Sequence, residues 1–148
     1  MAAIQRSELE VLRVEGDSAL RRLRVVYEVF VPTGDELEGE EVSEEIVVHG
    51  IGLADGLSTA DSHPITIHHD AFTVTPGRAS RVFEKLVHRR NLDVEQDWWR
   101  AGQGGETERI AEWIDHLVAD IRIEQAGRLV DQVTTDVVSG SWGVLGQD

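Results

Sequence analysis

Every second residue is apolar between Leu23 and Val31, and this period of two constrains the fold more than any other feature of the chain. Successive residues of a β-strand point to opposite faces, so one face of this segment is apolar while the other carries Arg24 and Glu28. The apolar face is rich in the β-branched and aromatic residues that strands favour, namely Leu23, Val25, Tyr27, Val29 and Val31. The segment therefore predicts a strand with one buried face.

Three further segments of the first half have the composition of strands. Residues 9–14 are expected to pair with the strand at 23–31 through a turn at 15–18, whose Gly and Asp favour a tight bend. Alternating or β-branched stretches predict a third strand over about residues 46–53 and a fourth over 65–74. The first half of the chain thus reads as strands joined by loops.

Thr75 and Pro76 resemble the start of a helix, with Thr as the capping residue and Pro at the first helical position. A helix from there to about residue 90 would place four apolar residues on one face, namely Ala79, Val82, Phe83 and Leu86. The pattern therefore predicts a central helix.

Two shorter helices are expected after the central one. Asp93 is positioned to cap a helix that contains Trp98 and Trp99, and Thr107 is positioned to open another. The apolar residues that this last helix would bury are Ile110, Ile114, Leu117 and Val118.

Residues 121–138 allow two interpretations. Val and Thr crowd the second part of the segment, which favours a hairpin with its turn at Ala126 and Gly127. A helix broken at Gly127 is the alternative. With the hairpin, residues 1–148 form a single α+β domain of about six mainly antiparallel strands, arranged as a sheet or as a small sandwich or barrel. Two to three helices lie in its central to C-terminal part, and residues 139–148 form a flexible or partner-docked tail.

The chain carries 28 acidic residues against 14 basic ones, of which only Lys85 is a lysine, and its net charge is −14. Like charges at this density repel one another and are screened by salt, so the composition indicates a salt-adapted protein from a halophilic or high-GC host. The acidity argues against sequence-specific nucleic-acid binding and against a membrane partner. Without cysteines, a signal peptide or a long apolar span, we expect a cytoplasmic or virion location and no cofactor.

Seven carboxylates lie within residues 35–45. We interpret this run as a solvated loop. A cation-binding loop is the alternative, but the run lacks the alternating ligand spacing and the central glycine of a calcium loop.

Histidines gather near residues 63–70, where His63, His68, His69 and Asp70 follow a strand that carries His49. Imidazole and carboxylate groups are metal ligands. Adjacent residues of a strand point to opposite faces, however, so His68 and His69 cannot both face one metal ion. We therefore interpret these histidines as surface or turn residues, and we assign no catalytic, metal-binding or cofactor-binding residue.

Five apolar residues are the candidate interface positions. Trp98 and Trp99 are adjacent, so they cannot both be central to a core, and protein interfaces are enriched in exposed tryptophan. Trp142, Val144 and Leu145 lie in a glycine-rich tail that is poorly placed to join the core of an isolated domain. These residues predict association with identical subunits or with other subunits of an assembly.

An arrangement of strands, a central helix and a closing hairpin resembles that of small tail-tube and head–tail components of tailed viruses and contractile injection systems. The resemblance implies a non-enzymatic structural subunit that assembles into a virion tail or connector. Two alternatives stay open. One is a small acidic binding or regulatory protein, including a mimic of nucleic acid, and the other is a metal-dependent enzyme that uses the histidine cluster at 63–70.

Overall fold

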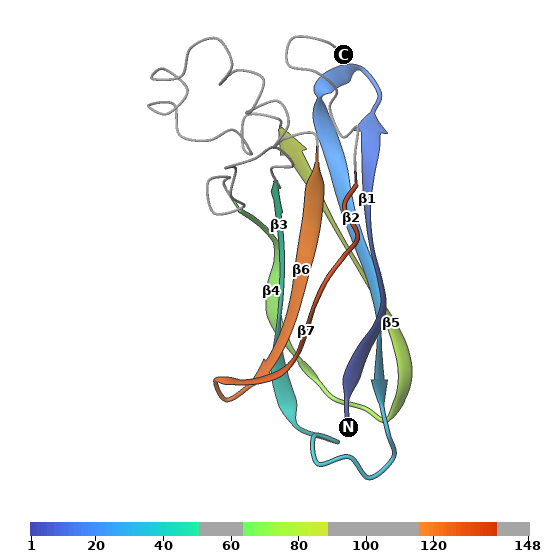
Figure 1. The fold of residues 1–148 in the computed structure, drawn as a ribbon, viewed down its shortest axis with the longest axis vertical. Helices are drawn as coiled ribbons and strands as arrows, with labels where there is room; N and C mark the ends of the chain where they lie inside the picture. Colours follow the sequence, from blue (N-terminus) through green and yellow to red (C-terminus); the bar gives the residue numbers. More distant parts are fainter. Residues whose placement is uncertain (51–63, 89–115, 139–148) are drawn as a thin grey trace.

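The computed structural model describes residues 1–50, 64–88 and 116–138, which form two antiparallel β-sheets packed face to face (Figure 1). The first sheet has three strands in the order β1-β2-β5, with bounds β1 (Ala3–Val14), β2 (Asp17–Val31) and β5 (Gly77–His88). The second has four strands in the order β4-β3-β6-β7, with bounds β3 (Glu41–Gly50), β4 (Ile65–Thr73), β6 (Leu117–Gln125) and β7 (Arg128–Thr134).

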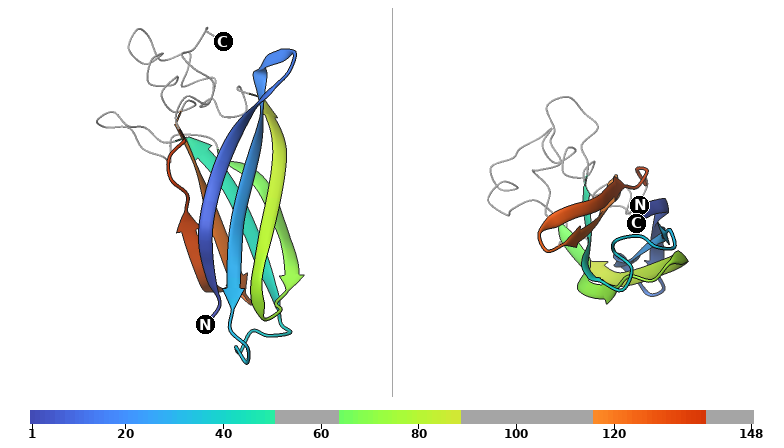
Figure 2. Two further views of the ribbon diagram at one scale, coloured as in Figure 1. Left: turned by 90° about the vertical axis from the view of Figure 1, so that its right-hand side faces the viewer. Right: turned by 90° about the horizontal axis from the view of Figure 1, so that it is seen from below.

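This strand order is that of an immunoglobulin-like sandwich in which the fourth strand pairs with the third instead of with the fifth. Three pairs of consecutive strands are divided between the sheets, namely β2 and β3, β4 and β5, and β5 and β6. The chain therefore passes from one sheet to the other three times before the β6–β7 hairpin (Figure 2). The arrangement buries one face of each sheet and leaves the other face to solvent.

The core lies between the two inner faces. The predicted apolar face of β2 is confirmed, because Leu23, Val25, Tyr27, Val29 and Val31 are all buried. The facing sheet contributes β-branched and aliphatic residues from β3 and β6, among them Val42, Ile46, Val48, Leu117, Ile121 and Ile123. Burial of each such side chain contributes about 1.5–3 kcal/mol, so the apolar alternation of β2 stabilises the sandwich directly.

Two predicted turns are confirmed. The β1–β2 connection turns at Gly16, where φ is 87°, and the β6–β7 connection turns at Ala126 and Gly127, where φ is 48° and 81°. Positive φ is the conformation that glycine adopts without steric cost, which explains why the glycines mark these turns. The hairpin interpretation of residues 121–138 is therefore confirmed over the helical one.

The predicted central helix is wrong. Residues 77–88 form β5, which pairs with β2 along its whole length, from Val31↔Gly77 to Leu20↔His88. The apolar residues of this segment fit a period of two as well as they fit the period of a helix. Arg81, Phe83 and Val87 point inward, whereas Val82 and Leu86 are exposed. Pairing with a strand about fifty residues earlier overrides the local helix-start signal at Thr75 and Pro76.

The α+β assignment is consequently wrong for the described part of the chain, which contains seven strands and no helix. Leu117 and Val118 begin β6 instead of ending a helix, and the remaining residues of the two later predicted helices lie outside the described ranges. The resemblance to tail-tube components depended on the central helix and loses that basis. Among the described residues, no helix has the length and apolar character to cross a membrane.

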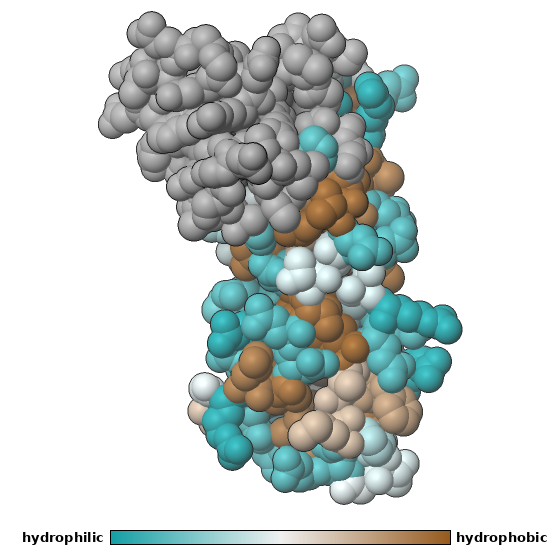
Figure 3. Space-filling view, in the orientation of Figure 1, coloured by the Kyte–Doolittle hydropathy of each residue, from teal (hydrophilic) through white to brown (hydrophobic). Residues whose placement is uncertain are grey.

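The acidic run at 35–45 divides into two parts. Residues 35–40 form a turn-rich loop, as predicted, but residues 41–45 belong to β3. In the view over β6 and β7, apolar side chains gather in patches down the middle of the surface with hydrophilic ones on either side (Figure 3). One carboxylate of the acidic run, Glu44, is buried.

Candidate functional site

Glu44 is the most unusual residue of the interior. Buried and more exposed residues alternate along β3, and Glu44 occupies the inward position between Val42 and Ile46. Its side chain is only 1% exposed. An ionised carboxylate in such a place is strongly destabilising unless it is paired and hydrogen-bonded.

Three side chains surround this carboxylate. Arg81 binds it with two parallel hydrogen bonds, from Nε to Oε2 at 2.5 Å and from Nη2 to Oε1 at 2.7 Å. The hydroxyl of Tyr27 donates to Oε2, and Nε2 of His68 lies 3.0 Å from Oε1. Tyr27 and Arg81 come from β2 and β5, whereas Glu44 and His68 come from β3 and β4, so these bonds join the two sheets.

Two phenylalanines enclose the charged groups. The ring of Phe83 stacks on the imidazole of His68, with centroids 3.9 Å apart and an interplanar angle of 21°. The ring of Phe72 lies 4.1 Å from Cζ of Arg81, within the range of a cation–π contact. We refer to Tyr27, Glu44, His68, Arg81, Phe72 and Phe83 together as the Glu44 cluster.

The Glu44 cluster contains the residue types of an active site, but its carboxylate is not accessible to a substrate. Both carboxylate oxygens already interact with Arg81 and with a second side chain, and the group is sealed from solvent. A general acid or base must reach a substrate proton within about 2.6–3.2 Å, and no such approach to Glu44 is open here. The arrangement therefore fixes how the two sheets meet.

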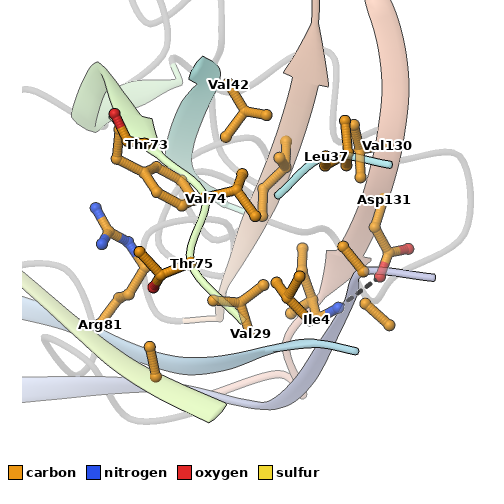
Figure 4. A pocket seen from close by; sticks show the side chains of 16 residues that line it. Ile4, Val29, Leu37, Val42, Thr73, Val74, Thr75, Arg81, Val130 and Asp131 are labelled. Carbon is orange, nitrogen blue, oxygen red and sulfur yellow. Dashed lines mark hydrogen bonds between the residues drawn. The ribbon is translucent and has the colours of Figure 1, made fainter. Parts of the chain in front are cut away.

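A small cavity of ≈ 70 Å³ lies between the sheets near the start of β1 (Figure 4). Its walls are mainly apolar and include Ile4, Val29, Leu37 and Val74. At one side Asp131 Oδ2 accepts a 2.7 Å hydrogen bond from the backbone N–H of Ile4, which ties β7 to β1. Ligand pockets usually measure about 300–1,000 Å³, so this cavity is too small for a cofactor or a sugar.

A larger cleft of ≈ 510 Å³ lies at the end of the sandwich between the loop at 32–37 and the β6–β7 turn. Asp35 on its wall accepts a 3.0 Å hydrogen bond from the backbone N–H of Leu37. This bond is the main reason that the pKa of Asp35 is lowered from its ordinary value of 3.8. Arg128 and Glu36 also line the cleft.

The histidines separate as their adjacency predicted. His68 points inward to Glu44, whereas His69 is exposed on the opposite face of β4. The interpretation of His68 as a simple surface residue is wrong, because it belongs to the Glu44 cluster. His49 is bound elsewhere, with Nε2 2.8 Å from Oδ2 of Asp120.

No three metal-ligating side chains among the described residues converge on a possible ion site. His63 lies outside those residues, and Asp70 is exposed with its carboxylate bound to the N–H of Ala71. The cation-binding alternative for residues 35–45 likewise finds no convergence of carboxylates within the described ranges.

The five predicted interface residues lie outside the residues that the structure describes, and so does the tail at 139–148. They are Trp98, Trp99, Trp142, Val144 and Leu145. These positions stay predictions.

Sequence reasoning missed the Glu44 cluster, although one signal was available. Val42, Ile46 and Val48 are apolar at a period of two, and Glu44 occupies the remaining inward position of that series. A carboxylate on the apolar face of a strand requires a buried partner. The surrounding acidic run concealed this signal, because it made Glu44 one of seven similar residues.

No protein-family model and no curated protein matches the chain. Among solved structures, the chain is similar to part of a putative beta-galactosidase from Bacteroides fragilis, with a TM-score of 0.55, 11% identity and coverage of 93% of this chain but 17% of that one. A beta-glucosidase from Bifidobacterium adolescentis is aligned over 100% of this chain and 18% of that one, with 9% identity and a TM-score of 0.41. At such identities the first similarity shows the fold alone.

Proposed function

We propose that the chain is a non-enzymatic structural domain that acts by associating with other subunits. The observation that carries this proposal is the Glu44 cluster. The acid, base and cation that could serve catalysis in this part of the chain are bound to one another across the two sheets. They contribute to the fold, and both oxygens of the Glu44 carboxylate are already occupied by partners from the chain itself.

The structural comparison supports the fold of such a domain and carries no role. A sandwich similar to this one makes up a minor part of a long putative galactosidase, where it spans 17% of the chain. The printed activity of that enzyme is not carried over, because fold does not imply function.

A virion tail or connector is one assembly in which such a domain would act, and the acidic composition supports a salt-rich environment. A net charge of −14 opposes association of identical copies at low ionic strength. Salt screens this repulsion, with a Debye length of roughly 3 Å at 1 M. Association is therefore expected to strengthen as salt is added.

The mass of the 148-residue chain in solution tests the proposal. Sedimentation equilibrium should give a mass above that of one chain in 0.15 M KCl, and the associated fraction should grow in 2 M KCl. A chain that stays monomeric in both buffers at about millimolar concentration would contradict self-association. Hydrolysis of chromogenic glycosides by the purified chain would contradict the non-enzymatic assignment.

A further inference from the structure

The outer face of the three-stranded sheet is electrically balanced, although the chain as a whole is strongly acidic. Residues paired across β1, β2 and β5 form rows on this face, such as Glu10–Arg24–Glu84 and Glu8–Val26–Val82. The charged residues of this face comprise as many arginines as glutamates: Arg6, Arg22, Arg24, Arg78, Glu8, Glu10, Glu28 and Glu84. This face therefore has no net charge to repel a second copy.

The same face exposes aliphatic side chains. Leu12 is 37% exposed, Val82 46% and Leu86 51%. Leu12 and Leu86 flank Arg22 in one row, and Val82 lies beside Val26 two rows further along the strands. Apolar rows thus alternate with charged rows, as in an interface with apolar anchors and polar specificity.

Two of the charged groups are incompletely satisfied within the chain. Nε of Arg24 is 3.8 Å from Glu84 and Oε2 of Glu28 is 3.9 Å from Arg6, both beyond hydrogen-bond length. These two atoms are covered by their own chain and have no hydrogen-bond partner among the described residues, whereas the Arg24 and Glu28 side chains as wholes are 39% and 20% exposed. Arg24 and Glu28 lie on the same strand, two positions on either side of Val26.

We propose that this face docks on the same face of a second copy of the chain. The two-fold axis lies in the interface, runs across the strands and passes at the level of Val26. This inference rests on the proposed function and names the surface that performs it. In an isologous contact each residue meets its counterpart reciprocally, so the row pattern can be read directly as a list of contacts.

The charges select this axis. With the axis across the strands, Arg24 of each copy faces Glu28 of the other, while Val26 faces Val26 and Arg22 faces Phe30. With an axis along the strands, Arg24 would face Arg24 and Glu28 would face Glu28. Like charges opposed in an interface weaken it. The first arrangement opposes one such pair, Glu8 with its counterpart, whereas the second opposes Arg24 and Glu28 each to its own counterpart, so the first is favoured.

The area is sufficient for a reversible dimer. Three strands spaced about 4.8 Å apart, with a rise of about 3.4 Å per residue, present roughly 600 Å² per copy. Two copies would bury about 1,200 Å², the lower limit of specific interfaces. We therefore expect a dissociation constant of about 1–100 µM, since interfaces of limited area bind weakly unless they contain strong anchors.

Charge reversal tests the pairing. In R24E, position 24 becomes acidic and opposes Glu28 of the partner at two symmetry-related places, and in E28R position 28 becomes basic and opposes Arg24. Each variant alone should dimerise at least about tenfold more weakly than the wild type, measured by sedimentation velocity in 0.15 M KCl. An equimolar mixture of R24E and E28R should restore dimers, because both contacts are then between opposite charges.

R122E is the matched control, because Arg122 lies on the outer face of the other sheet. It should dimerise as the wild type does, and E8Q should dimerise more tightly, since Glu8 faces its own copy across this axis. Circular dichroism melts establish that each variant is folded. If the wild type dimerises and R24E, E28R and their mixture dimerise with the same affinity, the proposed interface is wrong but the proposed assembly function stands. If the wild type is monomeric at every concentration and salt, both proposals fail.

Discussion

The outer faces of the two sheets differ in charge, although both belong to one acidic chain. The four-stranded sheet presents Glu41, Glu45, Asp120 and Glu124 with Arg122 as the one arginine among its paired outward positions. The three-stranded sheet presents equal numbers of arginines and glutamates. A whole-chain charge of −14 therefore describes neither face. Strand register, which decides which charges share a face, carries information that composition does not.

The inner faces are alike in composition, and the charged contact between them is the Glu44 cluster, which is called the joint below. The cores of both sheets are aliphatic, and the Glu44 cluster is where a carboxylate of one sheet meets an arginine of the other. Removing one member of a buried ion pair is much more destabilising than replacing the whole pair by apolar groups. The joint is accordingly the place where a single substitution should have the largest effect.

Glu44→Ala should lower the free energy of unfolding by about 3–5 kcal/mol, because it leaves the Arg81 guanidinium without its buried counter-charge. Glu45→Ala, one residue further on and on the outer face, should change it by no more than about 0.5 kcal/mol. Urea unfolding followed by tyrosine and tryptophan fluorescence measures both. Equal effects of the two substitutions would show that the inner and outer faces are not distinguished by burial.

His68→Ala should destabilise the chain by about 1–2 kcal/mol, since it removes a hydrogen bond to a carboxylate and a stacked ring. The value is moderate because the His68 side chain remains 24% exposed to water. His69→Ala, on the opposite face of β4, is the control and should lie within about 0.5 kcal/mol of the wild type. The same unfolding measurement applies, and a His69 effect as large as that of His68 would contradict the inward orientation.

The structural features behind these predictions differ in how well the sequence alone predicts them. The alternation of β2 and the glycine turn at Gly127 are local signals, and they predicted a buried strand and a hairpin correctly. β5 was mistaken for a helix because its apolar residues fit both periods, and its partner β2 is distant in sequence. Local capping preferences are weak compared with the pairing of twelve residues in a sheet.

The site was less predictable than the fold. The separation of His68 from His69 followed from strand geometry alone. The contact of Glu44 with Arg81 could not be foreseen, because it joins positions 37 residues apart that meet only when the two sheets pack. The balanced outer face likewise emerges only once β1, β2 and β5 are placed in register.

Neutralising acids should affect the two outer faces in opposite directions. Glu41→Gln with Glu45→Gln should raise the free energy of unfolding by about 0.5 kcal/mol in 10 mM salt, because it relieves repulsion on the four-stranded face. Glu10→Gln with Glu84→Gln should lower it by a similar amount, since Glu84 lies near both Arg22 and Arg24. Thermal melts in 10 mM and 1 M KCl measure the difference, which should vanish at the higher salt.

If both pairs of substitutions change the free energy of unfolding in the same direction, the charge difference between the two outer faces is contradicted. A difference that persists in 1 M KCl would indicate that packing, and not charge, is responsible.

Asp35 should give the smallest effect, and only over a limited pH range. Its pKa is lowered in the folded chain, mainly by the N–H of Leu37, so the ionised form is favoured by folding. The resulting contribution to the free energy of unfolding is present above the ordinary pKa of 3.8. It is lost as the pH falls through the lower pKa of the folded chain. Asp35→Asn should therefore be less stable than the wild type at about pH 6, and the difference should shrink as the pH falls below 3.8.

Urea unfolding across that range measures the effect, with Glu36→Gln at the neighbouring exposed position as the control. A stability difference for Asp35→Asn that does not change with pH would contradict the role of the ionised carboxylate.

Lys85 has a consequence of a different kind. It is the one lysine of the chain, and its Nζ donates a 3.0 Å hydrogen bond to the backbone carbonyl of Thr66, from β5 to β4. Acylating dyes would therefore label the α-amino group of Met1 and a single side chain, the one at the seam where the two sheets meet. A fluorophore attached there would report opening of that seam, with no need to introduce a cysteine.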